Sequence, residues 1–277
     1  MKLPNLSESM YVALLRYMHS IHESAERRGP DTLVRYFIPV VQRWRTAWIT
    51  RDELARFRAE PFYYYLLART KYYDQLIQDA VADGVKRIVI VGCGSDTRAY
   101  RFQDLLRGNG VGVLECDQPE AIHVKEHMAK RWRNGDRVEY LPIDLNDDVW
   151  PALGQWLGDR SDLKTLVLME GVSVYVHDSA FRRFLGFLGT SLSSGSHVAY
   201  DFKLREANDA FGRVGRTRTP FRLSPEPDAV TAFHDALGLR LERMELSSAL
   251  NGRFLTGLAQ PAAALFSEDC LLKLRVR

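Results

Sequence analysis

The chain has 277 residues and a mass of 31.7 kDa, which is long enough to bury a substantial core. Its content of 46% hydrophobic and 26% charged residues is typical of soluble globular proteins and excludes disordered and fibrous classes. The net charge is only +3, and basic residues alternate with acidic ones along most of the chain. Nucleic-acid binding is therefore not expected, because a phosphate-tracking surface needs clustered cations.

The cysteine content and the hydrophobic pattern indicate where the protein works. Cys93, Cys116 and Cys270 are odd in number and far apart, and residues 1–10 lack an apolar signal core, so we expect a cytoplasmic protein. No apolar stretch approaches the roughly twenty residues of a membrane helix, so no membrane association is expected.

The N-terminal part of the chain is predicted to be helical. Apolar residues recur at helical spacing from Ser7 to about Trp48, and a further helix is expected over about residues 60–81. Ser7 is a candidate cap for the first helix and Asp31 for the second. We therefore expect an N-terminal helical cap region over residues 1–82.

Residues 83–277 are predicted to form an α/β core, so that the chain makes one compact domain overall. Short apolar runs alternate there with helical connections, which predicts a mostly parallel central sheet with helices on both faces. A helix near residues 227–237 and strands near residues 239–246 and 253–260 would close the sheet with an antiparallel edge strand. The five parallel strands are expected at residues 87–92, 111–117, 138–144, 165–171 and 197–202.

A polar, arginine-rich stretch interrupts this core at about residues 203–227. Its weak periodicity is compatible with a loop, an exposed helix or a lid. If the segment folds over the site, Arg213 and Arg216 are candidate substrate ligands; otherwise they belong to a solvated loop.

The first predicted strand ends in a glycine turn, "GCGSDT", at residues 92–97. In open α/β sheets ligands bind at the carboxyl ends of the strands, where glycines admit a close approach. Gly92 and Gly94 suit that role, although a tight turn needs glycine whatever it binds. Asp117 ends the next strand and is suitably placed to accept hydrogen bonds from the hydroxyls of a ribose.

The composition of the turn narrows the choice of ligand. A third glycine is missing, and Asp96 stands where a pyrophosphate would approach. A negative side chain there disfavours phosphate, and hence a nicotinamide dinucleotide, and favours a cationic ligand. S-adenosylmethionine carries a ribose, an ammonium and a sulfonium but no phosphate, so it is the expected cofactor.

The motif "GCGSDTRAYRF", residues 92–102, resembles the glycine motif of the leucine carboxyl methyltransferase family, whose members depend on S-adenosylmethionine. Three further motifs follow the family's order: "ARTKYYDQ" before the first strand, "ECDQPEAIHVKEHM" at the second and "MEGVSVYV" at the fourth. The matches span roughly residues 69–201. The resemblance implies a Rossmann-like methyltransferase fold and an enzyme that transfers methyl groups.

Roles for the methionyl half of the cofactor are carried over from this resemblance. Arg69 would pair with the methionine carboxylate, which suits the planar fork of a guanidinium. Gly92 and Gly94 would line the methionyl portion, and Glu170 would face the cofactor ammonium or the substrate. The alternative for Arg69 is a surface position on a helix.

The resemblance also implies the residues around the nucleoside. Asp117 and its neighbour Gln118 would bind the cofactor at the ribose. Asp144 would accept from the adenine amino group, with Leu145 adding backbone contacts. The alternative for Asp144 is a helix cap after the third strand.

Methyl transfer is an in-line displacement that releases a thioether, so alignment and exclusion of water are the main demands on the protein. A carboxylate acceptor is ionised at neutral pH and needs no base, whereas a phenol or alcohol needs one. The candidates for a catalytic base are Glu170, Tyr175, His177 and Asp201.

Within the family that the chain resembles, some members methylate a protein C-terminus and others, often bacterial, methylate small metabolites. A small-molecule carboxylate is the favoured acceptor here, because the chain is short, with a compact N-terminal helical portion and a modest insertion between the fifth strand and the final strands. A hydroxyl group or a protein C-terminal carboxyl remains an alternative. Tyr73, Tyr175 and Asp201 are candidate substrate ligands, although the aromatic cluster that contains Tyr73 is expected to be mostly core.

A metal site, another class of function and a homodimer are the remaining alternatives. The histidine pairs His19/His22 and His123/His127 lack an evident third ligand, so no metal is expected. An NAD-dependent oxidoreductase and a non-catalytic binding protein are alternatives of another class. A homodimer is compatible with the sequence.

Overall fold

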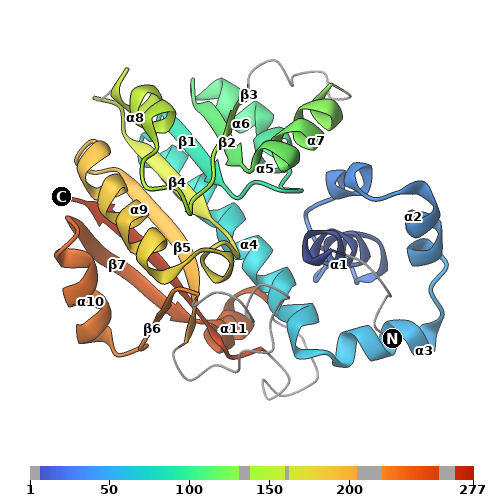
Figure 1. Ribbon diagram of the computed structural model, residues 1–277. Helices are drawn as coiled ribbons and strands as arrows, with labels where there is room; N and C mark the ends of the chain where they lie inside the picture. The colour runs from blue at the N-terminus through green and yellow to red at the C-terminus, as the bar shows by residue number, and fades with distance from the viewer. Residues whose placement is uncertain (1–6, 131–137, 160–161, 205–219, 256–265) are drawn as a thin grey trace.

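The computed structural model describes residues 7–130, 138–159, 162–204, 220–255 and 266–277. Its strands are β1 (Arg87–Val91), β2 (Gly112–Asp117), β3 (Val138–Pro142), β4 (Thr165–Met169), β5 (His197–Leu204), β6 (Arg222–Leu223), β7 (Leu239–Leu246) and β8 (Asp269–Val276). They form one sheet in the order β3-β2-β1-β4-β5-β8-β7, with β6 beside β5 (Figure 1). Strands β1 to β5 pair in parallel, and β8 is antiparallel to both of its neighbours. The predicted α/β class and mostly parallel sheet are confirmed.

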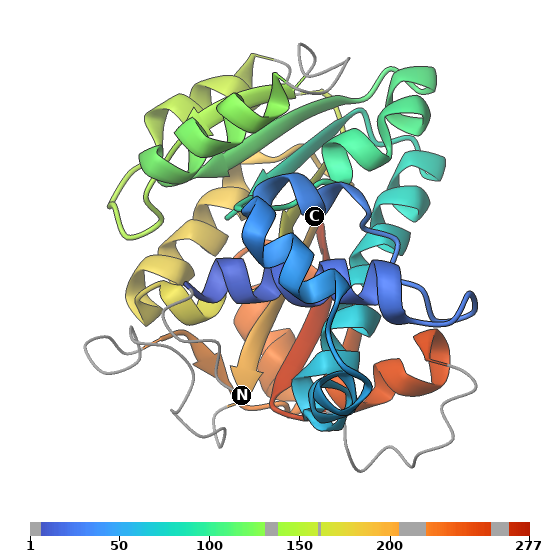
Figure 2. The same cartoon turned by 90° about the vertical axis from the view of Figure 1, so that its right-hand side faces the viewer.

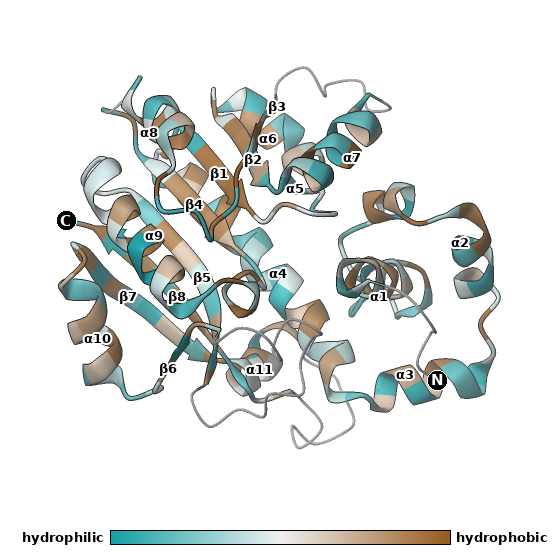
Figure 3. Ribbon diagram, in the orientation of Figure 1, coloured by the Kyte–Doolittle hydropathy of each residue, from teal (hydrophilic) through white to brown (hydrophobic). Residues whose placement is uncertain are grey.

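Helices cover both faces of this sheet because the parallel strands are apolar on both sides. On one face, Val89 and Val91 of β1 belong to the core under α8 (Pro151–Gly158), α9 (Asp178–Ser191) and α10 (Pro227–Asp235). On the other, Ile88 and Ile90 pack toward α4 (Pro61–Ala82), α6 (Gln103–Gly108), α7 (Pro119–Ala129) and α11 (Leu250–Phe254). Figure 3 shows the hydrophobic colouring concentrated in the central strands β1 and β4. This alternation fixes which residues emerge at the strand ends.

Four short elements precede α4: α1 (Glu8–His22), the 3-10 turn η1 (Leu33–Phe37), α2 (Val40–Ala47) and α3 (Arg51–Ala59). Ser7 caps α1 as predicted, since its hydroxyl accepts from the backbone N–H of Met10 at 3.3 Å. Leu15 and Met18 of α1 pack against α4, so the helical N-terminal region is anchored on the longest helix. In Figure 2, α1 crosses in front of the sheet.

The predicted second helix is divided. The carboxylate of Asp31 accepts from the N–H of Val34 at 3.0 Å, but the N-cap position is Thr32, one residue later, and the element is only the short turn η1. Pro39 then lies at the N-terminal boundary of α2, where its missing N–H costs nothing. Helix α3 was not predicted separately; a capping box between Thr50 and Glu53 marks its start.

The prediction of a strand near residues 253–260 was wrong. Arg253 and Phe254 end helix α11, where Phe254 packs edge-on against Tyr72 of α4, and residues 256–260 lie outside the described residues. The last strand is β8, inserted between β5 and β7. The antiparallel strand therefore lies one place in from the edge, and β7 forms the edge itself.

The predicted insertion at about residues 203–227 is described only at its ends. Lys203 and Leu204 extend β5, where they pair in parallel with β6, and Pro227 begins α10. Arg213 and Arg216 lie outside the described residues. Among the helices that the structure describes, none is both long and apolar enough to span a bilayer.

Candidate active site

A cavity of about 1300 Å³ lies where β1 and β4 stand side by side, the point at which the strand order of the sheet reverses. Ligand sites in α/β sheets form at such points, beyond the carboxyl ends of the strands. Typical ligand pockets measure roughly 300–1,000 Å³, so this cavity has room for two reactants. It brings together ten of the predicted site residues: Arg69, Gly92, Gly94, Asp117, Gln118, Asp144, Leu145, Glu170, Tyr175 and Asp201.

Two other predicted residues do not line this cavity. Tyr73 is fully buried, and its hydroxyl donates to the carbonyl of Met169 at 3.4 Å, so its position is that of a core residue and not of a substrate ligand. His177 stands beside the cavity, where its backbone N–H donates to the side chain of Asn146. Of the aromatic cluster Phe62–Tyr65, Tyr72 and Tyr73, Phe62 is the member that reaches the cavity wall.

The two glycines of the turn have different roles. Both adopt positive φ, 67° at Gly92 and 38° at Gly94, which side chains other than glycine rarely tolerate. A Cβ at Gly92 would meet Val172 at 2.5 Å, so packing requires glycine there. A Cβ at Gly94 would meet nothing within 4 Å, on a residue that lines the cavity. Gly94 therefore offers the bare backbone to which a ligand can come close.

Two carboxylates lie at the ends of β2 and β3. Asp117 Oδ2 accepts from the N–H of Gly94 at 2.7 Å, and its Oδ1 accepts from the N–H of Gln118 at 2.8 Å. Asp144 Oδ1 accepts from the N–H of Asn146 at 2.9 Å, while its Oδ2 accepts from Gln118 Nε2 at 3.3 Å. Asp144 Oδ1 also accepts from Asn146 Nδ2 at 3.0 Å. A carboxylate offers about four lone-pair sites, so Asp117, with two bonds accepted, keeps capacity for ligand hydroxyl groups.

The alternative role of Asp144 as a helix cap is not supported. The next helix, α8, begins at Pro151 and has Trp150 at its N-cap position. Asp144 instead closes the loop after β3, where its carbonyl accepts from the indole N–H of Trp150 at 3.1 Å. The carboxylate is left on the cavity wall.

Glu170, directly after β4, is surrounded by guanidinium groups. Its carboxylate forms ion pairs with Arg16 at 2.8 Å, Arg98 at 2.7 Å and Arg69 at 3.1 Å. Burial raises its pKa, but the three arginines outweigh burial and hold the pKa well below the usual range. Glu170 is therefore a fixed anion and a poor proton acceptor, which argues against its role as a base.

Arg69 is buried in α4, so the alternative of a surface position is wrong. Besides Glu170, its guanidinium pairs with Asp201 at 3.4 Å and approaches Asp269 at 3.9 Å. Burial lowers its pKa, and these carboxylates raise it well above the usual value. Arg69 therefore links the ends of β4, β5 and β8 into one charged wall of the cavity.

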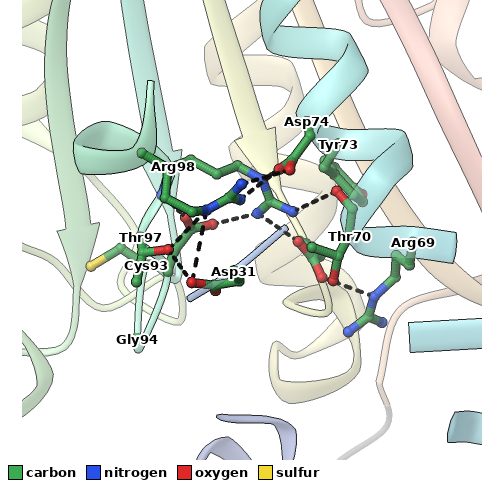
Figure 4. Close-up of polar contacts among 12 residues, drawn as sticks. Asp31, Arg69, Thr70, Tyr73, Asp74, Cys93, Gly94, Thr97 and Arg98 are labelled. Atoms are coloured by element: carbon green, nitrogen blue, oxygen red, sulfur yellow. Dashed lines mark hydrogen bonds and ion pairs between the residues drawn. The ribbon is translucent and has the colours of Figure 1, made fainter. Parts of the chain in front are cut away.

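Arg98 holds the glycine turn to α4, as Figure 4 shows. Its Nε donates to Asp74 at 2.8 Å, and its Nη2 donates to the carbonyl of Thr70 at 3.2 Å. Its Nη1 pairs with Asp96 at 2.5 Å, and this cation lowers the pKa of Asp96 although burial raises it. The charge of Asp96 is thus compensated within the protein, and it does not by itself repel a phosphate, contrary to the expectation from sequence.

Asp201 and Tyr175 differ in their suitability as bases. Burial, with Asp269 and Glu170 nearby, raises the pKa of Asp201 to about 7 despite Arg69, and its Oδ1 accepts from the N–H of Gly171 at 2.8 Å. Tyr175 donates its hydroxyl to Glu8 of α1, and burial together with that carboxylate raises its pKa. Asp201 can therefore exchange a proton near neutral pH, whereas Tyr175 stays a phenol.

Sequence reasoning missed several charged residues of the cavity wall, among them Arg16, Lys203 and Asp269. Arg16 comes from α1, and its buried Nε has no hydrogen-bond partner among the described residues. Lys203 pairs with Asp269 at 2.9 Å. A signal for Arg16 was its place on the apolar face of α1, next to Leu14 and Leu15 in sequence, where a charged residue is unusual.

Other candidate chemistry finds little support. Burial raises the pKa of the Cys93 thiol well above its usual value, so Cys93 is not an activated nucleophile. Within the described ranges, no three His, Cys, Asp or Glu side chains are grouped so that they could hold a metal ion. His123 and His127 are exposed on α7.

Comparisons with known proteins agree with this geometry. A candidate S-adenosyl-L-methionine-dependent methyltransferase of Streptomyces coelicolor is 28% identical over 222 residues, which cover 78% of this chain and 76% of that protein. One from Mycobacterium marinum is 32% identical over 139 residues, which cover 50% and 43%. A DUF574-family protein from Streptomyces avermitilis, of known crystal structure, shares the fold with a TM-score of 0.61 at 13% identity, over 96% of this chain and 97% of that one.

The family model of leucine carboxyl methyltransferases matches residues 9–189, more than half of the chain. The matched segment contains the glycine turn, Asp117, Asp144 and Glu170. This family match contradicts the alternative of an NAD-dependent oxidoreductase. The chain therefore belongs to the leucine carboxyl methyltransferase family, a family of S-adenosylmethionine-dependent enzymes, as its motifs predicted.

Proposed function

We propose that this S-adenosylmethionine-dependent methyltransferase methylates a carboxylate oxygen of a small-molecule acceptor. The observation that carries the proposal is that one cavity brings together a bare glycine turn, the carboxylates of Asp117 and Asp144 and a buried charged wall that contains Arg16 and Arg69. Its volume of about 1300 Å³ suits a nucleoside cofactor together with a second reactant.

The residues present fit S-adenosylmethionine, which supplies a methyl group on a sulfonium whose thioether leaving group needs no proton. Gly94 admits the cofactor close to the backbone. Asp117 accepts from the ribose hydroxyls, and Asp144 accepts from the adenine amino group. Arg69 and Arg16 face the methionine carboxylate, and the Nε–H of Arg16, which has no partner among the described residues, supplies a donor for it.

The cavity wall is also suited to a small acceptor. Tyr11 and Val12 of α1 and Phe62 of α4 line the cavity, so part of its wall is apolar and helps to exclude water. Lys203, which pairs with Asp269 at 2.9 Å and Glu268 at 3.7 Å, is the cation of the wall that we assign to an anionic acceptor. A carboxylate held there is already a nucleophile at neutral pH, so no residue has to remove a proton.

A hydroxyl acceptor is the second candidate, and Asp201 is the observation that favours it. Its carboxyl lines the cavity and has a pKa raised to about 7. A general base works best when its pKa lies near the working pH, so Asp201 could take the proton of a phenol or alcohol. If the acceptor is a carboxylate, Asp201 has no proton to remove from it.

The two candidates can be separated by the chemistry of the product. Matched acceptors that share a skeleton, such as an aromatic acid and the corresponding phenol, would be incubated with enzyme and cofactor and analysed by mass spectrometry. We expect methyl esters, which mild alkali cleaves, and less product with Asp117→Ala when the cofactor is limiting. Methylated products that all survive alkali would contradict carboxyl methylation and support the hydroxyl candidate. Failure of the protein to bind S-adenosylhomocysteine at all would contradict both.

A further inference from the structure

A lysine that no ligand can reach lies beneath the glycine turn. Lys125, on α7, is completely buried and does not line the cavity. Its ammonium reaches three backbone carbonyls of the turn: Asp96 at 2.5 Å, and Cys93 and Gly94 at 3.4 Å each. An ammonium has three N–H donors, so these carbonyls occupy the capacity of the group.

A buried glutamate compensates this charge. Glu115 of β2 is fully buried and lies 3.2 Å from Lys125 Nζ. Its second oxygen accepts from the hydroxyl of Tyr100 at 3.3 Å, and that hydroxyl also contacts Tyr140 of β3. Because an isolated charge in the interior is very costly, the ammonium can stay under the turn only with such a partner.

The contacts of Lys125 determine which side of the turn faces the cavity. Three carbonyls point inward to the ammonium, while the N–H of Gly94 points to Asp117 at the cavity edge. We propose that Lys125, held by Glu115, is a positioning residue that keeps the glycine turn in the shape that receives the cofactor. The identity of the ligand in this inference rests on the proposed function.

A purely structural role is the competing explanation. In that case Lys125 only neutralises Glu115, and removing both charges together would be harmless to binding. In the positioning role, removing both charges restores the electrostatic balance of the core but removes the ammonium donor from the carbonyls of Gly94 and Asp96, while the carbonyl of Cys93 keeps the N–H of Asp96. The two roles therefore predict different cofactor affinities for the double variant but similar stabilities.

The test compares Lys125→Met, the double variant Lys125→Met/Glu115→Gln and the control Lys130→Met. Lys130 is an exposed lysine just after α7. S-adenosylhomocysteine affinity would be measured by calorimetry and stability by thermal unfolding. We expect Lys125→Met to weaken binding about tenfold or more, because small errors of position are costly at a binding site, and the control to bind as wild type does.

The double variant decides between the two roles. It should regain much of the thermal stability lost in Lys125→Met while its affinity stays at least about tenfold weak. An affinity within about twofold of wild type, in either the single or the double variant, would overturn the inference. If the single variant does not fold, the double variant carries the comparison alone. Wild-type protein that does not bind S-adenosylhomocysteine would overturn the proposed function, and the inference with it.

Discussion

Replacing Asp117 by alanine tests the nucleoside end of the site most directly. The carboxylate lies at the tip of β2 and accepts from the N–H groups of Gly94 and Gln118 at 2.7 and 2.8 Å. Its remaining lone pairs are the proposed acceptors for the ribose hydroxyls. The variant thus loses a charge-assisted bond to the ligand and a tether of the turn.

The expected size of the effect follows from these contacts. One charge-assisted hydrogen bond contributes about 1 to 3 kcal/mol. That range corresponds to an increase of about 5- to 150-fold in the Kd for S-adenosylhomocysteine. Because the tether to Gly94 is lost as well, we expect the upper half of the range. Asp117→Asn keeps one acceptor oxygen and should lose less.

Calorimetric titration with S-adenosylhomocysteine gives the affinities, and thermal unfolding shows that each variant is folded. Asp104→Ala is the matched control, since Asp104 is an exposed carboxylate on α6 whose pairing partner is also exposed. Its affinity should equal that of wild type. Unchanged affinity in Asp117→Ala would refute the placement of the ribose at the tip of β2.

Three further predictions follow from the charged wall and the turn. Arg98→Met should destabilise the protein by about 3–5 kcal/mol in urea unfolding, because it leaves buried carboxylates uncompensated. The control Arg107→Met removes an exposed ion pair and should cost at most about 1 kcal/mol. The folded-state pKa of Asp201, about 7, lies above the unfolded value of 3.8. The stability that this residue contributes is therefore present below pH 4 and is lost as the pH rises through 7. Asp201→Asn should improve stability relative to wild type more at pH 8 than at pH 5. Gly94→Ala should weaken cofactor binding, with a strain cost of about 1–3 kcal/mol. Gly92→Ala should lower the stability of the protein more, because its Cβ would clash with Val172. Equal unfolding midpoints of the two variants would contradict this distinction.

Much of the sheet could be predicted because β1 to β5 are short apolar runs, and β1 to β4 end at or just before a glycine, an acid or a proline. Strand β8 could not be predicted in the same way. Its residues pair with β5 on one side and β7 on the other, and this insertion between two earlier strands is decided by long-range packing. The segment around Phe254 is equally apolar but belongs to a helix, because short apolar runs do not distinguish helix from strand.

The cavity was predictable where its residues follow strands and unpredictable where they come from distant helices. Asp117, Asp144 and Glu170 each stand just after a strand, and parallel strands bring those positions together. Arg16 precedes Glu170 by 154 residues, and no local sequence pattern predicts their ion pair. Tyr73 is the opposite case, since its motif suggested the site but its ring lies in the core.

The turn also shows why this crevice does not suit a pyrophosphate. Dinucleotide folds bind phosphate with free backbone N–H groups at the glycine turn and at the start of the helix that follows. Here three of those donors are used inside the protein. The N–H of Gly94 binds Asp117, the N–H of Asp96 binds the carbonyl of Cys93 at 2.7 Å, and the N–H of Arg98 binds the Asp96 carboxylate at 2.7 Å.

Asp96 therefore acts against phosphate by a different route from simple repulsion. Its charge is compensated by the Arg98 guanidinium, but its Oδ1 takes the N–H at the start of α5 (Arg98–Arg101), which a phosphate oxygen would need. A phosphate entering here would have to displace these bonds and leave buried acceptors unsatisfied, at a cost of about 1–3 kcal/mol for each group. A nucleoside that ends in a sulfonium and an amino acid makes no such demand, so the hydrogen bonds of the turn favour it over a dinucleotide.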